Sequence, residues 1–234
     1  NYLRYNKEAK KIKLENEILE IEKNTLDGVI NESSKNIENV LNRSIKIFTL
    51  TTEGISKSDI KLLKKNSRQV TKLSDEVDEL QENIFNYLKS NKKANKKATE
   101  FYLIILEKLT QITKRLNKIS KITLKHVDED RRKLPLSNIK VLLGLDLNFK
   151  RLFESVINIF INKDFKKIED VLLDIIQARD EIESQIKRYI EENQDKKKYD
   201  KLHLEILSLC SEVLNALKQL LENYYSIKSE TELK

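Results

Sequence analysis

The sequence has very few of the residues that interrupt helices or make sharp turns. Its 234 residues include three glycines and one proline. A sheet protein needs many turn residues between its strands, so this scarcity favours long helices joined by short polar connections. Leucine, isoleucine and valine are plentiful and recur periodically, which argues against disorder despite a charged fraction of 35%. We therefore predict an all-α fold.

Methionine and tryptophan are absent, and cysteine occurs once. The single Cys210 cannot form an internal disulfide, which fits a reducing compartment. No apolar run approaches the roughly 20 residues that span a bilayer, and no signal peptide is visible. Because the chain lacks methionine and begins at Asn1, we expect it to be a fragment or a processed product.

The motifs that usually mark an enzyme are also missing. There is no Walker loop, dinucleotide fingerprint or nucleophile elbow. His126 and His203 lack a second histidine or a cysteine at ligand spacing, so we expect each at the surface or at a boundary. Cys210 lies on an apolar helix face and is interpreted as a small buried hydrophobe. A nucleophilic pair of Cys210 with His203 would have no third residue to orient it. We predict that the chain is not an enzyme.

The charge balance is basic, with a formal net charge of +7. One interpretation is an anionic partner, such as phosphate, nucleic acid or a membrane surface. The favoured alternative is a lysine-rich solvated surface. The sequence contains no recognition helix and no aromatic-rich platform, so we do not expect a nucleic-acid partner.

The clearest helical pattern runs from Val70 to Leu88. Its apolar residues alternate steps of three and four, which draws a narrow stripe along one side of a helix. An acidic block surrounds the stripe, and 105 residues later Asp180-Glu181-Ile182-Glu183 repeats Asp75-Glu76-Val77-Asp78. The apolar stripe consists of Val70, Leu73, Val77, Leu80, Ile84 and Tyr87.

Local signals predict where several helices begin and end. Gly54 suits the left-handed position after a helix. The segment 56–59, Ser-Lys-Ser-Asp, resembles a capping box for the next helix. The charge cluster and the single proline at 126–135 predict a boundary, after which Ser137 is placed to cap a helix. Asp164 is a candidate N-cap for the following helix.

Gly144 lies inside a predicted helix and costs about 1 kcal/mol there relative to alanine. A close crossing of two helices would explain its use. Together the periodicity and these boundary signals predict six helices, at 28–52, 57–90, 99–125, 137–163, 165–193 and 200–227.

The predicted helices repeat in order, because the second and fifth carry acidic blocks while the third and sixth have wide apolar faces. Segment 103–106 matches 204–207, Ile112 matches Val213 and Leu116 matches Leu217, each 101 residues apart. We predict two tandem three-helix bundles packed on their widest faces. The predicted domains are a charged lead-in helix (1–27), a first repeat (28–134), a second repeat (135–229) and a tail (230–234).

This pattern resembles the PhoU family, whose members are two tandem three-helix bundles that regulate phosphate uptake. The second helix of each repeat in that family typically reads D-x-x-I/V-D-x-L-E-x-x-I. The segment from Asp75 to Ile84, DEVDELQENI, is similar to it, and 180–183 is similar more loosely. The resemblance covers about residues 28–229.

A narrower likeness concerns the end of the third predicted helix. Segment 101–119, followed by His126-Val127-Asp128, is similar to the PhoU-like tail of some bacterial phosphate permeases. The resemblance implies a cytoplasmic regulatory domain at the inner face of the membrane. Its implied partner is a membrane phosphate transporter, either in the same chain or in a separate one. Contact with the inner leaflet and formation of a homodimer are both left open.

Two lysine runs are candidates for contact with a membrane or a partner. Each follows an acidic helix and precedes a wide apolar one, so repeat symmetry predicts that both project from the same end of the molecule. Anionic lipid would attract them by about 1 kcal/mol for each lysine, and ordinary loop solubility is the alternative. The runs are Lys92, Lys93, Lys96 and Lys97, and then Lys196, Lys197 and Lys198.

Carboxylates on neighbouring helix turns are candidates for divalent metal binding. The alternative is a solvated helix face, and the residues favour no cofactor. The family's E/D-x-x-x-D metal motif is poorly kept, because Gln111, Lys114 and Arg115 stand where acids are expected, and a nearby cation opposes a second one. The candidate ligands are Asp75, Asp78, Glu82, Asp180, Glu183 and Glu212.

The expected function is a non-enzymatic PhoU-like regulatory domain of phosphate transport. Two alternatives stay open at this point. One is a helical scaffold or adaptor whose stripe at 70–87 binds a partner helix. The other is a metal-binding helical protein.

Overall fold

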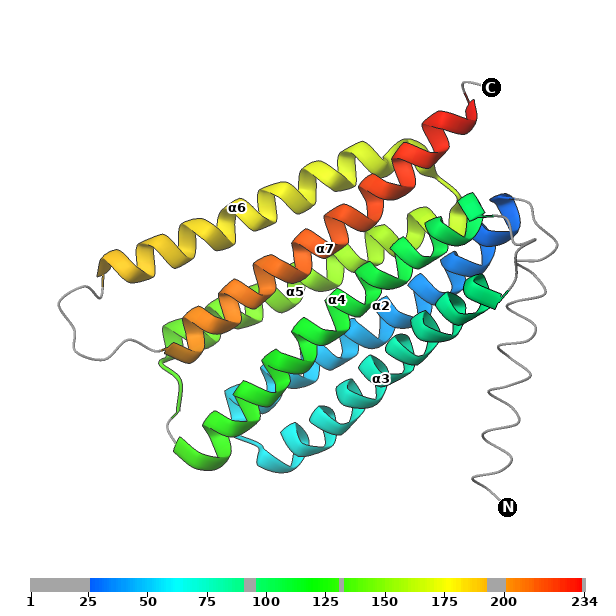
Figure 1. The fold of residues 1–234 in the computed structure, drawn as a ribbon. Helices are drawn as coiled ribbons and strands as arrows, with labels where there is room; N and C mark the ends of the chain where they lie inside the picture. The colour runs from blue at the N-terminus through cyan, green and yellow to red at the C-terminus, as the bar shows by residue number, and fades with distance from the viewer. Residues whose placement is uncertain (1–25, 91–95, 131–132, 193–200, 233–234) are drawn as a thin grey trace, which may run out of the picture.

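The computed structural model describes residues 26–90, 96–130, 133–192 and 201–232, which contain helices and no strand (Figure 1). The all-α prediction is confirmed for these residues. The predicted lead-in helix falls almost wholly outside them. A π-helical turn, η1 (His126–Asp130), extends α4, and a 3-10 turn, η2 (Phe165–Lys167), precedes α6. The α-helices are α2 (Leu26–Lys57), α3 (Ile60–Ser90), α4 (Lys96–Lys125), α5 (Leu136–Asn162), α6 (Ile168–Glu192) and α7 (Lys201–Glu232).

The helices alternate in direction along the chain (Figure 1). Helices α2, α3 and α4 each pack against the other two, α5 lies along α2, and α7 lies along both α4 and α6. Two contacts fix the antiparallel direction of α5 on α2: the ring of Phe48 stacks on that of Phe149, and the Thr49 hydroxyl donates to Asp146 Oδ1 at 2.8 Å. The described helices therefore form one continuous bundle. In it, α2 contacts α5 and α4 contacts α7, so α2 and α4 connect the N-terminal helices to the C-terminal ones.

Helices α4 and α7 carry the centre of the core. Each is apolar on more than one side because each packs against several neighbours. Burying each large aliphatic or aromatic side chain contributes about 1.5–3 kcal/mol. The predicted contact between the two widest apolar faces is confirmed, while the division into two tandem bundles stays a prediction. The fully buried side chains include Tyr102, Ile105, Leu109, Ile112, Leu116, Leu207, Val213, Leu217 and Leu220.

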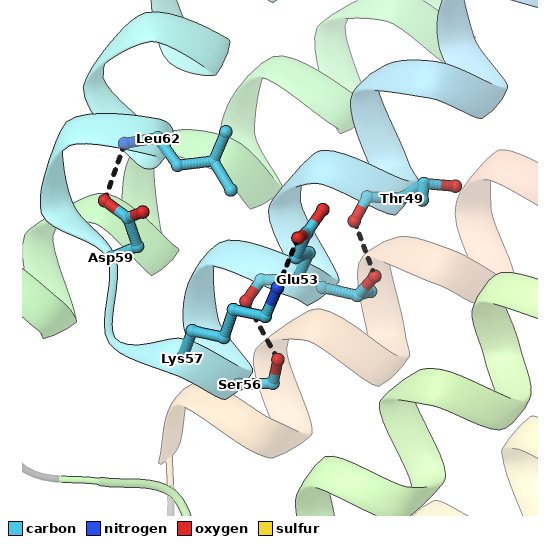
Figure 2. Close-up of polar contacts among 7 residues, drawn as sticks. Thr49, Glu53, Ser56, Lys57, Asp59 and Leu62 are labelled. Carbon is cyan, nitrogen blue, oxygen red and sulfur yellow. Dashed lines mark hydrogen bonds and ion pairs between the residues drawn. The ribbon is translucent and has the colours of Figure 1, made fainter.

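The turn between α2 and α3 differs from the predicted one. Gly54 lies inside α2 with an ordinary negative φ, and Ser58 takes the left-handed position at φ 54° instead. Asp59, rather than Ser56, caps α3, because its Oδ1 accepts a hydrogen bond from the Leu62 N–H at 3.0 Å (Figure 2). Both predictions placed the end of α2 too early. The Ser56 hydroxyl instead donates to the Glu53 carbonyl and stays within the helix.

Neither predicted cap of the later helices makes a side-chain capping bond, although Asp164 does lie at the predicted position just before η2. Ser137 lies inside α5, which begins after Pro135 without a side-chain capping bond. Asp164 makes no capping hydrogen bond, and its carboxylate pairs with Lys167 at 2.7 Å. The end of α5 is set by the backbone, because Lys163 adopts the left-handed conformation at φ 54°.

The close helix approach predicted at Gly144 occurs at Gly54. A Cβ atom at Gly54 would lie 2.6 Å from Leu63 Cδ2, and Leu63 is fully buried. At Gly144 a Cβ atom would meet nothing within 4 Å. Gly54 therefore makes room for the packing of α3, whereas Gly144 has no role inside the described part of the fold.

These two glycines give a matched test of the packing. Gly54→Ala should lower the free energy of unfolding by about 1 kcal/mol, because overpacking of about 1–3 kcal/mol exceeds the gain in helix propensity. Gly144→Ala should raise it by up to about 1 kcal/mol, or about 2–4 °C in Tm. Thermal and urea unfolding followed by circular dichroism measure both.

A Leu63→Ala background provides the control. There the penalty of Gly54→Ala should disappear, because the atoms that crowd the new methyl group are gone. Equal stabilisation by the two alanine substitutions in the unaltered chain would contradict the close approach at Gly54.

Candidate docking surface

Polar contacts hold α2, α3 and α4 tightly together. Arg43 Nη1 on α2 lies 2.6 Å from Glu76 Oε2 on α3, and both side chains are about one-third exposed. The buried Asn66 Nδ2 donates to the Ile47 carbonyl at 2.9 Å. The Asn36 amide donates to the Tyr102 hydroxyl at 2.6 Å and joins α2 to α4. These contacts tie α2 to both α3 and α4.

Helices α5 and α6 are joined less closely. An ion pair between Arg151 and Asp174, at 2.7 Å, links them on the side of η2. Beyond this pair the helices enclose a groove of about 300 Å³, with Gly144 on the α5 wall, Ala178 on the α6 wall and Leu214 of α7 among its apolar lining residues. Two of the wall residues thus have little or no side chain, which leaves the space between the helices open.

The polar residues that line this groove are Lys140, Asn148, Glu181 and Gln185. Glu181 is exposed and lines the groove, and its Oε1 accepts a hydrogen bond from Gln177 at 3.4 Å. Gln185 Oε1 is shielded from solvent and has no hydrogen-bond partner among the described residues. Lys140 also lines the groove, but its side chain is exposed. A buried carbonyl oxygen without a donor costs about 1–3 kcal/mol. A ligand that donates a hydrogen bond to Gln185 Oε1 would remove this cost.

An apolar face on α5 adjoins the groove. Leu136, Leu143 and Leu147 are spaced seven and four residues apart, which places them on one side of the helix. Their exposed fractions are 73%, 44% and 70%, respectively. Gly144 lies beside Leu143 and Leu147, and nothing in the described fold covers it. Clustered exposed apolar residues of this kind mark interaction sites.

The candidate metal ligands lie on α3, α6 and α7, and several are paired with cations. Lys114 Nζ lies 3.0 Å from Asp78 Oδ1, Arg179 pairs with Glu183 at 3.3 Å, and Arg115 pairs with Glu212. Within the described ranges, no group of three or more His, Cys, Asp or Glu side chains could hold a metal ion. The remaining candidates, Asp75, Glu82 and Asp180, are exposed.

The two lysine runs are candidates for contact with a membrane or a partner, and their side chains are not among the described ones. Lys92, Lys93 and Lys196 to Lys198 lie outside the described residues, as do the side chains of Lys96 and Lys97, which begin α4. The start of α4 lies near the end of α7, since Phe101 contacts Tyr224, whereas α7 begins at the opposite end (Figure 1). The helix ends that flank the two runs thus lie at opposite ends of the described bundle, while the placement of the lysines themselves stays a prediction.

The single cysteine and the two histidines show no catalytic arrangement. Cys210 is fully buried, as predicted, and burial raises the pKa of its thiol well above the ordinary value. His203 is 3% exposed and lies beside the ring of Tyr189, so the surface alternative is wrong for it, while its place near the start of α7 fits the predicted boundary. The residue sits on the face of α7 that α6 covers. His126 is partly buried at the start of η1, which fits the predicted boundary.

Burial of Cys210 predicts a thiol that does not react in the folded protein. Burial disfavours the thiolate, and the raised pKa keeps the thiol protonated through pH 9. Ellman's reagent at pH 8 should therefore modify Cys210 only after addition of denaturant. Stoichiometric modification within seconds under native conditions would contradict the buried position.

Comparison with known proteins gives no relative for this fold. No protein-family model, no curated protein and no solved structure matches the chain. Among the residues that the structure describes, none of the helices has the length and apolar character that crossing a membrane requires. The chain is therefore characterised by its own features: a helical bundle with an open groove between α5 and α6.

Sequence reasoning missed this groove as a site. Gly144 was noticed, but its interpretation as a helix crossing assigned it to the interior of the fold. The exposed leucines gave a usable signal, because Leu136, Leu143 and Leu147 fall opposite the buried side of the same helix. The spacing of apolar residues gives no signal for the open space between α5 and α6.

Proposed function

We propose that this chain is a non-enzymatic, PhoU-like regulatory domain of phosphate transport that docks on a membrane phosphate transporter, in cis or in trans. The proposal rests chiefly on one observation, a twofold correspondence between α2–α4 and α5–α7. The domain would act by contacting two conformations of the transporter unequally, which shifts the population between them.

The pattern of burial supports the correspondence. The buried positions of α4 recur in α7 after 101 residues, and those of α3 recur in α6 after 105 residues. For example, Leu63, Asn66, Val70, Leu73 and Val77 correspond to Ile168, Val171, Ile175, Ala178 and Ile182, which are all buried. These two offsets are the ones at which the apolar and acidic motifs of the sequence repeat.

Contacts between the halves follow the same offset. Phe48 and Phe149 are 101 residues apart, and their ring centroids lie 4.6 Å from each other. A residue that touches its own counterpart is expected where a twofold axis passes between two equivalent helices. On α4 and α7, the contact of Phe101 with Tyr224 and the pairing of Lys118 with Glu205 define an antiparallel register that centres close to Ile112 and Val213, another pair 101 residues apart.

This correspondence supports the doubled three-helix architecture that the resemblance implies. The acidic motif lies on α3 with Val77 buried and Asp75 exposed, so the Asp75 carboxylate faces solvent, whereas Glu76 and Asp78 form ion pairs within the bundle. The groove and the leucines of α5 supply an apolar surface of the kind that a regulatory domain needs for a protein partner. A helical adaptor without a role in phosphate transport is the second candidate, favoured by the same leucine face.

Deletion within the parent protein tests the proposed function. In cells that depend on the parent protein, removal of residues 28–229 should change the rate of phosphate uptake or its response to external phosphate. Uptake of radiolabelled phosphate at low and high external concentration measures both. Unchanged uptake and unchanged regulation would overturn the proposal and leave the adaptor as the remaining candidate.

The control for this experiment is a folded variant with an altered surface. Leu143→Glu with Leu147→Glu changes two exposed side chains and should leave the circular dichroism spectrum and Tm nearly unchanged. If docking through α5 carries the regulation, this variant should reproduce the loss seen after deletion. A matched variant at exposed positions of α2, Asn42→Glu with Lys46→Glu, should not.

A further inference from the structure

We propose that the groove between α5 and α6 is a socket for an arginine side chain carried by an amphipathic helix of a partner protein. The inference uses the twofold correspondence described above and names the chemistry by which the proposed regulatory domain would recognise its partner. It does not depend on phosphate transport.

The first half of the molecule contains a filled version of the socket. Arg43 extends from α2 to α3, where its Nη1 lies 2.6 Å from Glu76 Oε2. Lys72 approaches the same carboxylate at 3.8 Å, and the buried side chain of Leu73 lies on the same helix, three residues before Glu76. An arginine therefore occupies the space between two helices and pairs with a carboxylate on the second one.

The second half keeps the acid and lacks the arginine. At the offset of 101 residues Arg43 corresponds to Gly144, and at the offset of 105 residues Glu76 corresponds to Glu181. Leu73 corresponds to Ala178 by the same offset. Gly144, Glu181 and Ala178 all line the groove. The groove is thus open where Gly144 and Ala178 replace larger side chains. Beside this space lies Glu181, whose counterpart Glu76 is paired with an arginine.

The remaining groups of the groove suit a guanidinium. A guanidinium presents five N–H donors on a planar group with apolar faces, and the groove offers a carboxylate, an amide oxygen and apolar walls. Gln185 Oε1 is buried without a donor, whereas its counterpart in α3 is the apolar Leu80. A bound arginine would donate to Gln185 Oε1 and Glu181 while its methylene groups cover the apolar wall.

Other charged groups near the groove are either exposed or already paired. Lys140 lines the groove, but its exposed side chain can turn toward solvent when a second cation enters. Arg179 on α6 pairs with Glu183, and Arg151 on α5 pairs with Asp174. No described arginine therefore fills the position that Arg43 fills in the first half.

The surface beside the groove indicates that the arginine belongs to a helix. Leu143 and Leu147 are exposed on the adjoining side of α5, and the bare backbone at Gly144 lets another helix approach closely. Glycine inside a helix costs about 1 kcal/mol, and no internal contact offsets that cost here. A partner helix with leucines one turn on either side of an arginine would cover the α5 leucines and fill the groove.

A synthetic helix provides the probe. The peptide has roughly 18 residues, or about five turns, with a hydrocarbon staple and one central arginine flanked by leucines. The control peptide replaces arginine with citrulline, which keeps the shape and removes the charge. We expect the arginine peptide to bind the purified chain in fluorescence anisotropy, and the citrulline peptide to bind about tenfold more weakly.

Variants of the chain localise the binding. Glu181→Gln should weaken the arginine peptide about tenfold and leave the citrulline peptide unchanged, whereas Glu183→Gln, on the same helix but outside the groove, should change neither. Gly144→Arg should abolish binding of both peptides, because the new side chain fills the socket from within. Gly144→Arg should also raise the Tm above that of Gly144→Ala, because the new arginine pairs with Glu181. In the Glu181→Gln background this difference in Tm should disappear.

Three outcomes would overturn the proposal. The first is equal affinity of the two peptides, and the second is an affinity of the arginine peptide that does not change in Glu181→Gln. The third is self-association of the chain that Gly144→Arg abolishes, which would identify the occupant as a second copy. Binding as expected together with unchanged phosphate uptake after deletion of residues 28–229 would retain the socket and reject only the transport function.

Discussion

The contact between α4 and α7 is the constraint on which the rest of the fold depends. Each helix must be apolar on several sides, because α4 also packs on α2 and α3 while α7 also packs on α6. Side chains such as Leu109, Ile112, Val213 and Leu217 are consequently buried completely. With these two helices antiparallel and in contact, α2 and α3 cover the outer side of α4, α6 covers that of α7, and α5 packs on α2 and α6.

The two sides of this central pair are closed to different degrees. In the first half, Asn36 and Tyr102 tie α2 to α4 by a buried hydrogen bond of 2.6 Å. The corresponding positions in the second half, 101 residues later, are Ser137 and His203, and Ser137 is exposed. Helix α5 is thus held by α2 more than by α7, and the groove follows from this loosened contact. A binding surface can arise in this way from loss of internal ties, without any new catalytic group.

Apolar spacing was sufficient to predict the helices and the contact between the widest faces, because burial follows the period of the helix. It could not predict the roles of the two glycines, since the neighbours of Gly54 and Gly144 come from other helices. The side-chain capping bonds predicted for Ser56, Ser137 and Asp164 do not form, for the related reason that backbone geometry at Ser58 and Lys163 ends the helices. The groove was missed because it lies where position 144 has glycine and the corresponding position 43 has arginine. Only the structure shows that Arg43 pairs with Glu76.

Zero-length cross-linking of the native chain tests the antiparallel pairing of α4 and α7 most directly. Lys118 Nζ lies 3.4 Å from Glu205 Oε1, and both side chains are partly exposed. After carbodiimide treatment, peptide mass spectrometry should identify an amide bond between Lys118 and Glu205. A bond from Lys118 to Glu222, near the far end of α7, in place of Glu205 would mean that the helices are parallel, and would contradict the proposed twofold correspondence.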